Sequence, residues 1–168
     1  DHLCASELQY CLQPFTDESH CPFAIYGNDR VLEIISSRYP DWPFEIIRTQ
    51  SYEPLNVAGT KVTPIHAYHK LEEDAHNFLM EARGKTFLYA TDTGLWEPEV
   101  WDFLAQHQLD GLVLEATDGL NKTDYYGHLS LAECISQVER LREHNILKPD
   151  ALVATTHISH LGGLTHDE

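Results

Sequence analysis

The sequence is poor in positively charged residues. It contains 11 Lys and Arg residues against 27 Asp and Glu residues, and its formal net charge is −16 at pH 7 with neutral histidines. Proteins that bind nucleic acid or anionic lipid over a broad surface do so through clustered Lys and Arg, whose contacts release counterions. The composition therefore argues against a broad nucleic-acid surface and against a membrane partner. Any phosphate-bearing partner has to be bound locally.

Cysteines are also few, and none of them are arranged in pairs. Cys4, Cys11, Cys21 and Cys134 form no CxxC motif, and no signal peptide is recognisable. Disulfides belong mainly to oxidising compartments, so we predict reduced thiols and a cytoplasmic protein. The chain also lacks an uninterrupted apolar run long enough to cross a bilayer.

The length of 168 residues suits one hydrophobic core, and we expect a single domain over residues 1–168. The only methionine is Met80, while the chain begins at Asp1. Residues 165–168 have the Ser/Thr-x-x-Glu form of a capping box, which announces a helix. We therefore expect a partial domain, truncated at both ends.

The spacing of apolar residues predicts alternating helices and strands. Two helices are expected at 5–13 and from Asp29, and two more from Pro98 and after Ser130, where Ser130 and Glu133 form a capping box. A hairpin is expected at 77–91 and a loop at 52–59, with further strands at 23–26, 44–48, 61–65, 111–116 and 151–155. A mixed sheet covered by helices, of the α/β class, is the economical architecture.

An acid at the end of a buried strand is the first functional clue. The apolar run 85–90 leads directly to Asp92 and a glycine turn. A carboxylate there loses hydration unless a cation, a metal or hydrogen-bond donors meet it. Because the chain has few Lys and Arg but eleven histidines, a metal held by imidazoles is the better candidate. The alternative is that Asp92 caps the turn through Thr93 and Gly94.

Three further positions resemble Asp92. His69 and His157 each close an apolar strand where a loop begins, and Asp1-His2 adds another acid and imidazole. Each histidine alone could simply be solvated or hydrogen-bonded. Together, imidazoles and carboxylates are the mixture that borderline divalent metals such as zinc accept.

Four motifs, taken in order, resemble the metallo-β-lactamase-fold hydrolases. They are Val62-Thr63-Pro64-Ile65-His66-Ala67-Tyr68-His69, Tyr89-Ala90-Thr91-Asp92-Thr93-Gly94, Gly127-His128-Leu129-Ser130 and Thr156-His157-Ile158-Ser159-His160. The similarity is to the branch of the phosphoribosyl cyclic phosphodiesterases and the tRNA 3′-processing ribonucleases. It implies an αββα sandwich, and Asp1-His2 would be the last two residues of the family's His-x-His-x-Asp-His motif.

The resemblance also implies a metal centre with two divalent ions, zinc by preference, with manganese or iron as alternatives. One ion would be held by His69 with two upstream histidines, the other by Asp1, His2 and His157, and Asp92 would bridge them. Asp1 would in addition orient or deprotonate the attacking water.

His128 lies just before a helix N-terminus, a place that favours an anion. The resemblance implies that His128 contacts the substrate phosphate and donates a proton to the leaving group; alternatively, it merely flanks the helix. His160 is expected to orient a metal ligand rather than to bind metal itself. Tyr125 and Tyr126 could line a substrate entrance or pack against the following helix.

The function expected is hydrolysis of a small cyclic or nucleotide-type phosphodiester by metal-activated water. The acidic composition argues against tRNA processing. The alternatives are hydrolysis of another ester, a thioester or a lactam on the same fold, or a non-catalytic metal-binding fragment. An unpaired sheet edge would allow self-association, for which a homodimer is the simplest state.

Overall fold

A computed structural model describes residues 3–16, 24–43 and 45–163. The chain divides into two compact units, Asp1–Gln50 and Ser51–Glu168. The expectation of one domain over residues 1–168 stays a prediction. None of the helices in the described ranges is long and apolar enough to span a membrane.

The first unit contains a short βαβ step. The step consists of strand β1 (Ala24–Gly27), helix α1 (Asp29–Arg38) and strand β2 (Glu45–Arg48), and the 3-10 helix η1 (Ala5–Cys11) precedes it. Strands β1 and β2 pair in parallel. Helix α1 begins after Asn28, whose side chain accepts a hydrogen bond from the Val31 amide at 3.0 Å. The predicted elements are confirmed here, except that Phe23 and Phe44 lie outside the described residues.

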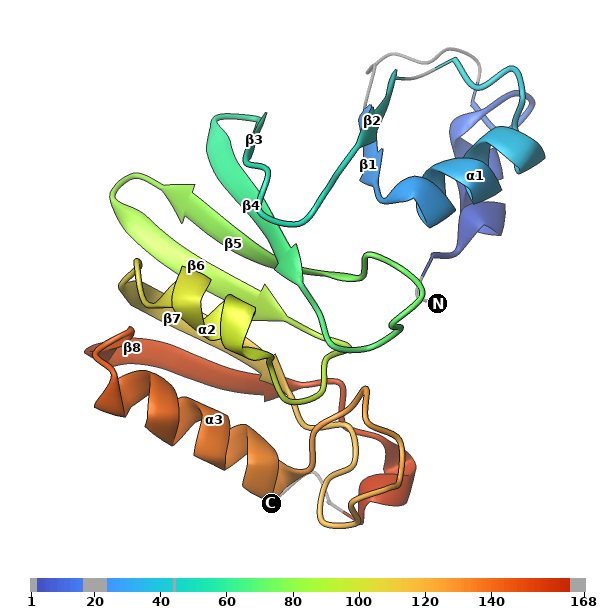
Figure 1. The fold of residues 1–168 in the computed structure, drawn as a ribbon. Helices are drawn as coiled ribbons and strands as arrows, with labels where there is room; N and C mark the ends of the chain where they lie inside the picture. The colour runs from blue at the N-terminus through green and yellow to red at the C-terminus, as the bar shows by residue number, and fades with distance from the viewer. Residues whose placement is uncertain (1–2, 17–23, 44, 164–168) are drawn as a thin grey trace. The chain divides into compact units, whose positions relative to one another are not determined.

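The second unit is built on a six-stranded mixed sheet in the order β3-β4-β5-β6-β7-β8 (Figure 1). Its strands are β3 (Leu55–Val57), β4 (Thr60–His66), β5 (His76–Ala82), β6 (Lys85–Ala90), β7 (Leu109–Glu115) and β8 (Leu147–Thr156). Neighbours are antiparallel from β3 to β6 and parallel from β6 to β8. The predicted mixed α/β class is confirmed. Strand β3 falls where a loop was expected, because a strand of three residues is too short to show a period.

Helices α2 (Pro98–Leu104) and α3 (Leu131–Glu143) cover one face of this sheet (Figure 1). Both begin where the sequence predicts, and α3 carries the complete capping box of Ser130 and Glu133. The core lies between these helices and the sheet, and its fully buried members include Leu79, Leu88, Leu104, Leu112, Leu114 and Leu141. The guanidinium of Arg140 stacks 3.9 Å above the Trp101 ring and so ties α3 to α2.

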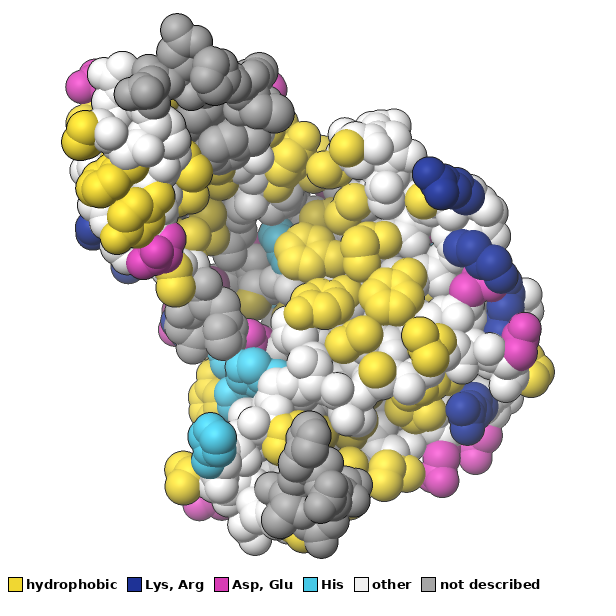
Figure 2. Space-filling model, turned by 180° about the vertical axis from the view of Figure 1, so that it is seen from behind, with side chains coloured by type: hydrophobic (Ala, Val, Ile, Leu, Met, Phe, Trp, Pro, Cys, Tyr) yellow, Lys and Arg dark blue, Asp and Glu magenta, His cyan; other side chains and the backbone are white. Residues whose placement is uncertain are grey.

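The other face of the sheet is apolar as well. Phe87 and Val113 are partly buried on this face, whereas Tyr89 and Leu152 are 41% and 71% exposed. Hydrophobic side chains gather over this part of the chain in the view from behind (Figure 2).

The parallel strands decide where a site can form. Ala90 of β6 pairs with Leu114 of β7, and Leu114 pairs with Thr155 of β8. These three strands therefore end level with one another. Ligand sites of α/β sheets lie at the carboxyl ends of parallel strands, where loops bring polar side chains together.

Candidate metal centre

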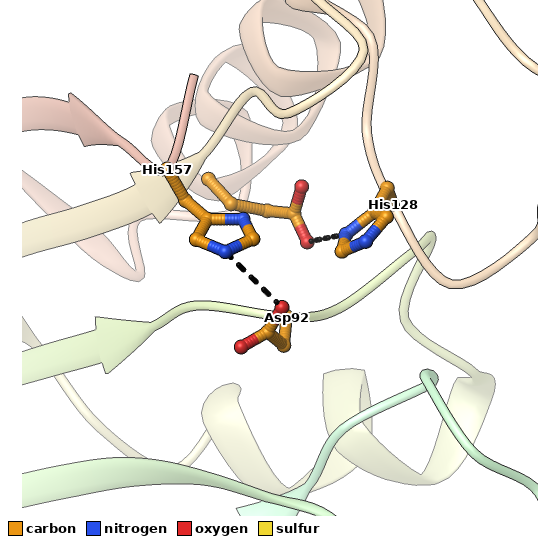
Figure 3. Close-up of side chains that lie close together, drawn as sticks. Asp92, His128 and His157 are labelled. Carbon is orange, nitrogen blue, oxygen red and sulfur yellow. Dashed lines mark hydrogen bonds and ion pairs between the residues drawn. The ribbon is translucent and has the colours of Figure 1, made fainter. Parts of the chain in front are cut away.

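Four polar side chains converge at the carboxyl ends of β6, β7 and β8. They are Asp92, which follows β6, Glu115, the last residue of β7, His128, which precedes α3, and His157, which follows β8. Figure 3 labels Asp92, His128 and His157. One ligand-type atom from each lies within 4.8 Å of the others. The described residues therefore contain a cluster of possible metal ligands. Of its members, the sequence predicts Asp92 and His157 as ligands and His128 as a substrate contact.

Glu115 is the member that the sequence reasoning missed. Its side chain is fully buried, and it accepts hydrogen bonds from five groups. Oε1 accepts from the Thr93 amide at 2.6 Å and from His128 Nδ1 at 2.9 Å. Oε2 accepts from the amides of Thr117 and Leu129 at 3.1 and 3.2 Å and from the Thr117 hydroxyl. Burial by itself raises the pKa of Glu115, but the hydrogen bonds from His128 and Thr117 and the His128 charge outweigh it and lower the pKa. Glu115 is thus an ionised acceptor whose oxygens are already engaged.

The Glu115 carboxylate orients His128. A carboxylate can only accept, so Nδ1 of His128 carries the proton in this hydrogen bond. Burial lowers the pKa of His128, but the hydrogen bond and charge of Glu115, with the charges of Asp92 and Asp118, outweigh burial and raise the pKa. His128 is therefore biased toward the imidazolium form, which suits a proton donor or an anion contact better than a metal ligand.

His157 is oriented through Thr117. The Thr117 hydroxyl donates to Glu115, so its oxygen accepts a hydrogen bond from His157 Nδ1, 2.7 Å away. The neutral imidazole then carries its lone pair on Nε2, which lies 3.5 Å from Oδ1 of Asp92 (Figure 3). Two ligand atoms at about 2.1 Å from one tetrahedral ion would be about 3.4 Å apart. The Asp92–His157 pair therefore fits a divalent metal, and Thr117 supplies the outer support that metal-binding histidines usually have.

If Asp92 capped the turn, its carboxylate would accept hydrogen bonds from the amides of Thr93 and Gly94, but both amides have other acceptors. The Thr93 amide donates to Glu115, and the Gly94 amide donates to the Tyr68 carbonyl at 2.8 Å. Asp92 and His157 share another property, a left-handed backbone with φ of 50° and 59°. This region is uncommon for residues other than glycine, and such residues concentrate at functional sites.

His69 lies beside this cluster. It is 5% exposed, its Nδ1 donates to the Gly127 carbonyl at 3.0 Å, and its ring centroid is 5.0 Å from that of His128. Because a carbonyl only accepts, the proton of the neutral ring is on Nδ1 and the lone pair is on Nε2. This tautomer is compatible with the predicted ligand role.

The remaining predicted residues either lie outside the described ranges or do not belong to the four-residue cluster. Asp1 and His2 lie outside the described residues, as does the predicted capping box at 165–168. His160 is exposed at the start of the 3-10 helix η2 (His160–Gly162). Its role in orienting a ligand stays a prediction.

Glu115 could have been found in the sequence by the argument that singled out Asp92. It is an acid at the end of the apolar run 111–114, followed by Ala116 and Thr117, and its burial requires donors.

Comparison with known proteins identifies the family. The model of the beta-lactamase superfamily domain matches residues 1–158. The chain belongs to this superfamily. No curated protein matches the sequence at a significant level. Solved structures of the metallo-β-lactamase fold do match, so the predicted fold is confirmed.

Three of these structures illustrate the similarity. The metallo-beta-lactamase fold protein YhfI from Bacillus subtilis is 19% identical, with a TM-score of 0.70 over 97% of this chain and 61% of that one. A diphosphatase of the PhnP family is 20% identical, with a TM-score of 0.67 over 92% and 54%. The short form of human tRNase Z is 15% identical, with a TM-score of 0.60 over 83% and 62%. At these identities the similarity shows the fold alone, and the chain spans between 54% and 62% of the length of each of these structures.

The role assigned to Thr117 can be tested through metal affinity. We expect Thr117→Val to weaken divalent-metal binding by about tenfold to a hundredfold, because valine keeps the shape but cannot accept the His157 proton. Competition with a chromogenic chelator measures the affinity. Thr117→Ser keeps the hydroxyl and should stay close to the wild type, and equal affinities for all three proteins would refute this role.

Proposed function

We propose that the protein is a metal-dependent hydrolase of a small phosphodiester, with a centre of two divalent ions for which zinc is the first choice. The observation that supports it is the adjacency of an Asp92–His157 ligand pair and a His128 side chain whose Nδ1 donates a hydrogen bond to Glu115 at 2.9 Å. Such a combination can hold a metal and donate a proton within one site. Divalent ions, when bound, supply Lewis acidity for activating water and for the charge that develops on phosphoryl oxygens.

In this proposal the chain's own residues have separate tasks. Asp92 would bridge the two ions, one of them held by His69 with two upstream histidines and the other by His157 with Asp1 and His2, as the family resemblance implies. Asp1 would also act on the attacking water. His128 contacts a phosphoryl oxygen and protonates the leaving group, while Glu115 keeps its Nδ1 proton in place. Thr117 keeps the lone pair of His157 on Nε2.

The substrate is proposed to be a small molecule. The net charge of −16 gives no broad electrostatic attraction for nucleic acid. A cytoplasmic location and a homodimer stay predictions.

Metal content and turnover test this function together. We expect about two equivalents of divalent metal per chain in the full-length protein, and a loss of at least one equivalent in Asp92→Ala, by plasma mass spectrometry. Hydrolysis of phosphodiesters, followed by phosphorus NMR, should disappear with the metal and return when metal is restored. Asp102→Ala, an exposed acid on α2, is the matched control and should keep both.

Metal-free wild-type protein, or an Asp92→Ala protein with full metal content, would refute the metal centre. Bound metal with turnover of carboxylic esters, thioesters or lactams, but of no phosphodiester, would keep the centre and reject the substrate class.

A further inference from the structure

Three tyrosines stand beside the candidate metal centre. The ring centroids of Tyr68 and Tyr126 are 5.2 Å apart, and those of Tyr125 and Tyr126 are 5.1 Å apart. The Tyr125 ring is also 5.6 Å from the His69 ring and 5.3 Å from the His128 ring. We call Tyr68, Tyr125 and Tyr126 the tyrosine wall. It continues directly from the imidazoles of the site.

A hydrogen bond and two close glycine contacts hold the tyrosine wall in place. The Tyr125 hydroxyl donates to the His69 carbonyl at 3.0 Å. A Cβ atom on Gly94 would lie 1.8 Å from the Tyr126 carbonyl oxygen, and one on Gly127 would lie 2.7 Å from the Tyr125 ring. Gly94 therefore packs against the backbone of Tyr126, and Gly127 packs against the side chains of Tyr125 and His69, at distances that only glycine permits. Such packing fixes the rings before any ligand arrives.

Despite this support, the wall offers ring surface to solvent. Tyr125 is 38% exposed and Tyr126 is 41% exposed. A rigid, exposed aromatic surface next to a reactive centre lowers the entropy cost of binding a flat group, because the rings do not need to be ordered.

The charges around the tyrosine wall do not favour binding of an anionic group of the substrate in addition to the phosphodiester at the metal centre. Lys122 lies on the loop that precedes Tyr125, and its amine contacts the His128 carbonyl at 2.8 Å and the Glu133 carboxylate at 3.1 Å. Lys70, next to His69 in the sequence, pairs with Glu73 at 3.9 Å. Both lysines already face acceptors. The wall is therefore suited to an uncharged, planar part of a substrate.

We propose that the tyrosine wall binds a nucleobase, so that the substrate is a nucleoside phosphodiester rather than a sugar phosphate without a base. The inference rests on the proposed function, since the phosphodiester has to reach the metal centre while the base stacks on the rings. Every base has a π-face that an aromatic side chain can stack on, so the wall favours bases as a class over other groups.

Tyr126 is the position at which to test the proposal, because Tyr125 also supports His69 through a hydrogen bond. Two substrates are compared with the metal-loaded, full-length protein: adenosine 2′,3′-cyclic phosphate and the 2,3-cyclic phosphate of methyl riboside, which lacks a base. Tyr126→Leu removes the ring, and Tyr126→Phe keeps it.

We expect Tyr126→Leu to raise KM for the adenosine substrate by about 5-fold to 150-fold, the range typical of one lost base-stacking contact. The kcat of this substrate should change little, and both constants for the base-free substrate should stay unchanged. Tyr126→Phe should behave as the wild type with both substrates. An equal effect of Tyr126→Leu on the two substrates, or no effect on either, would overturn the proposal.

A binding measurement separates this proposal from the proposed function. If the wild type hydrolyses neither substrate, calorimetric titration with adenosine monophosphate and with ribose 5-phosphate decides on the wall independently of turnover. Binding of adenosine monophosphate that weakens in Tyr126→Leu but not in Tyr126→Phe supports the wall. No binding, or equal binding by all three proteins, overturns it.

Discussion

Replacing Glu115 with glutamine is expected to lower the free energy of unfolding of the metal-free protein by about 3 to 5 kcal/mol. The wild-type carboxylate accepts hydrogen bonds from three backbone amides, one hydroxyl and one imidazole. A glutamine offers one oxygen and an amide group that only donates, so part of this buried ring of donors would face another donor. Urea denaturation at neutral pH measures the change.

The matched control is Glu143→Gln, which removes the same charge from an exposed position at the end of α3. This control should lie within about 0.5 kcal/mol of the wild type. If the two glutamine variants are equally stable, the buried carboxylate is not what holds the loops of the site together.

Glu115→Gln should also change how the free energy of unfolding depends on pH. The pKa of Glu115 is lowered in the folded protein, so its contribution is present above its unfolded value, about 4.5, and is lost as pH falls through the folded value. The pKa of His128 is raised, so its contribution is present below its unfolded value, about 6.5, and is lost as pH rises through the folded value. Their joint contribution is therefore largest between about pH 4.5 and 6.5 in the metal-free protein. Glu115→Gln should flatten both limbs, and unchanged limbs would contradict the coupling.

Replacing His128 with alanine is expected to lower kcat by about a hundredfold to ten-thousandfold, with metal content unchanged. The reason is that its Nδ1 is bound to Glu115 and its raised pKa favours a protonated ring, so the side chain is placed as an acid rather than as a ligand. Turnover of the phosphodiester and metal content have to be measured on the same preparation.

His144→Ala is the control for this experiment, because His144 is an exposed histidine at the C-cap of α3. It should leave kcat and metal content as they are. Loss of metal in His128→Ala would make His128 a ligand, which its position in the four-residue cluster allows geometrically. Retained activity with retained metal would remove it from the reaction.

The site residues that the sequence predicts are those whose position follows from a single neighbouring strand. Asp92 and His157 each follow an apolar strand, and that placement alone brings them to an edge of the sheet. The starts of α2 and α3 can also be predicted from neighbouring residues alone, because a first-turn proline marks the one and a capping box marks the other. The resemblance then adds the family, which the match over residues 1–158 confirms.

What the sequence could not give depends on contacts between distant segments. Glu115 meets Thr93 across 22 positions and Leu129 across 14, and no spacing rule connects them. The bond between Thr117 and His157 spans 40 positions and requires that β7 and β8 be neighbours. The sequence leaves the choice between the two roles of Tyr125 open for the same reason, since its partner His69 lies 56 positions away on another loop.

The left-handed backbone of Asp92 and His157 has an evolutionary consequence. Glycine adopts this conformation without cost, and Asn, Asp and His adopt it more readily than other side chains do. Random substitution at either position is thus filtered by the main chain before any chemistry is selected. Ala58 and Arg83 show that other residue types can adopt this conformation, but the side chains most enriched in it, those of Asn, Asp and His, carry an oxygen or nitrogen that can bind a metal. The shape of the two loops therefore favours metal-binding residue types at both positions, independently of the chemistry that they perform.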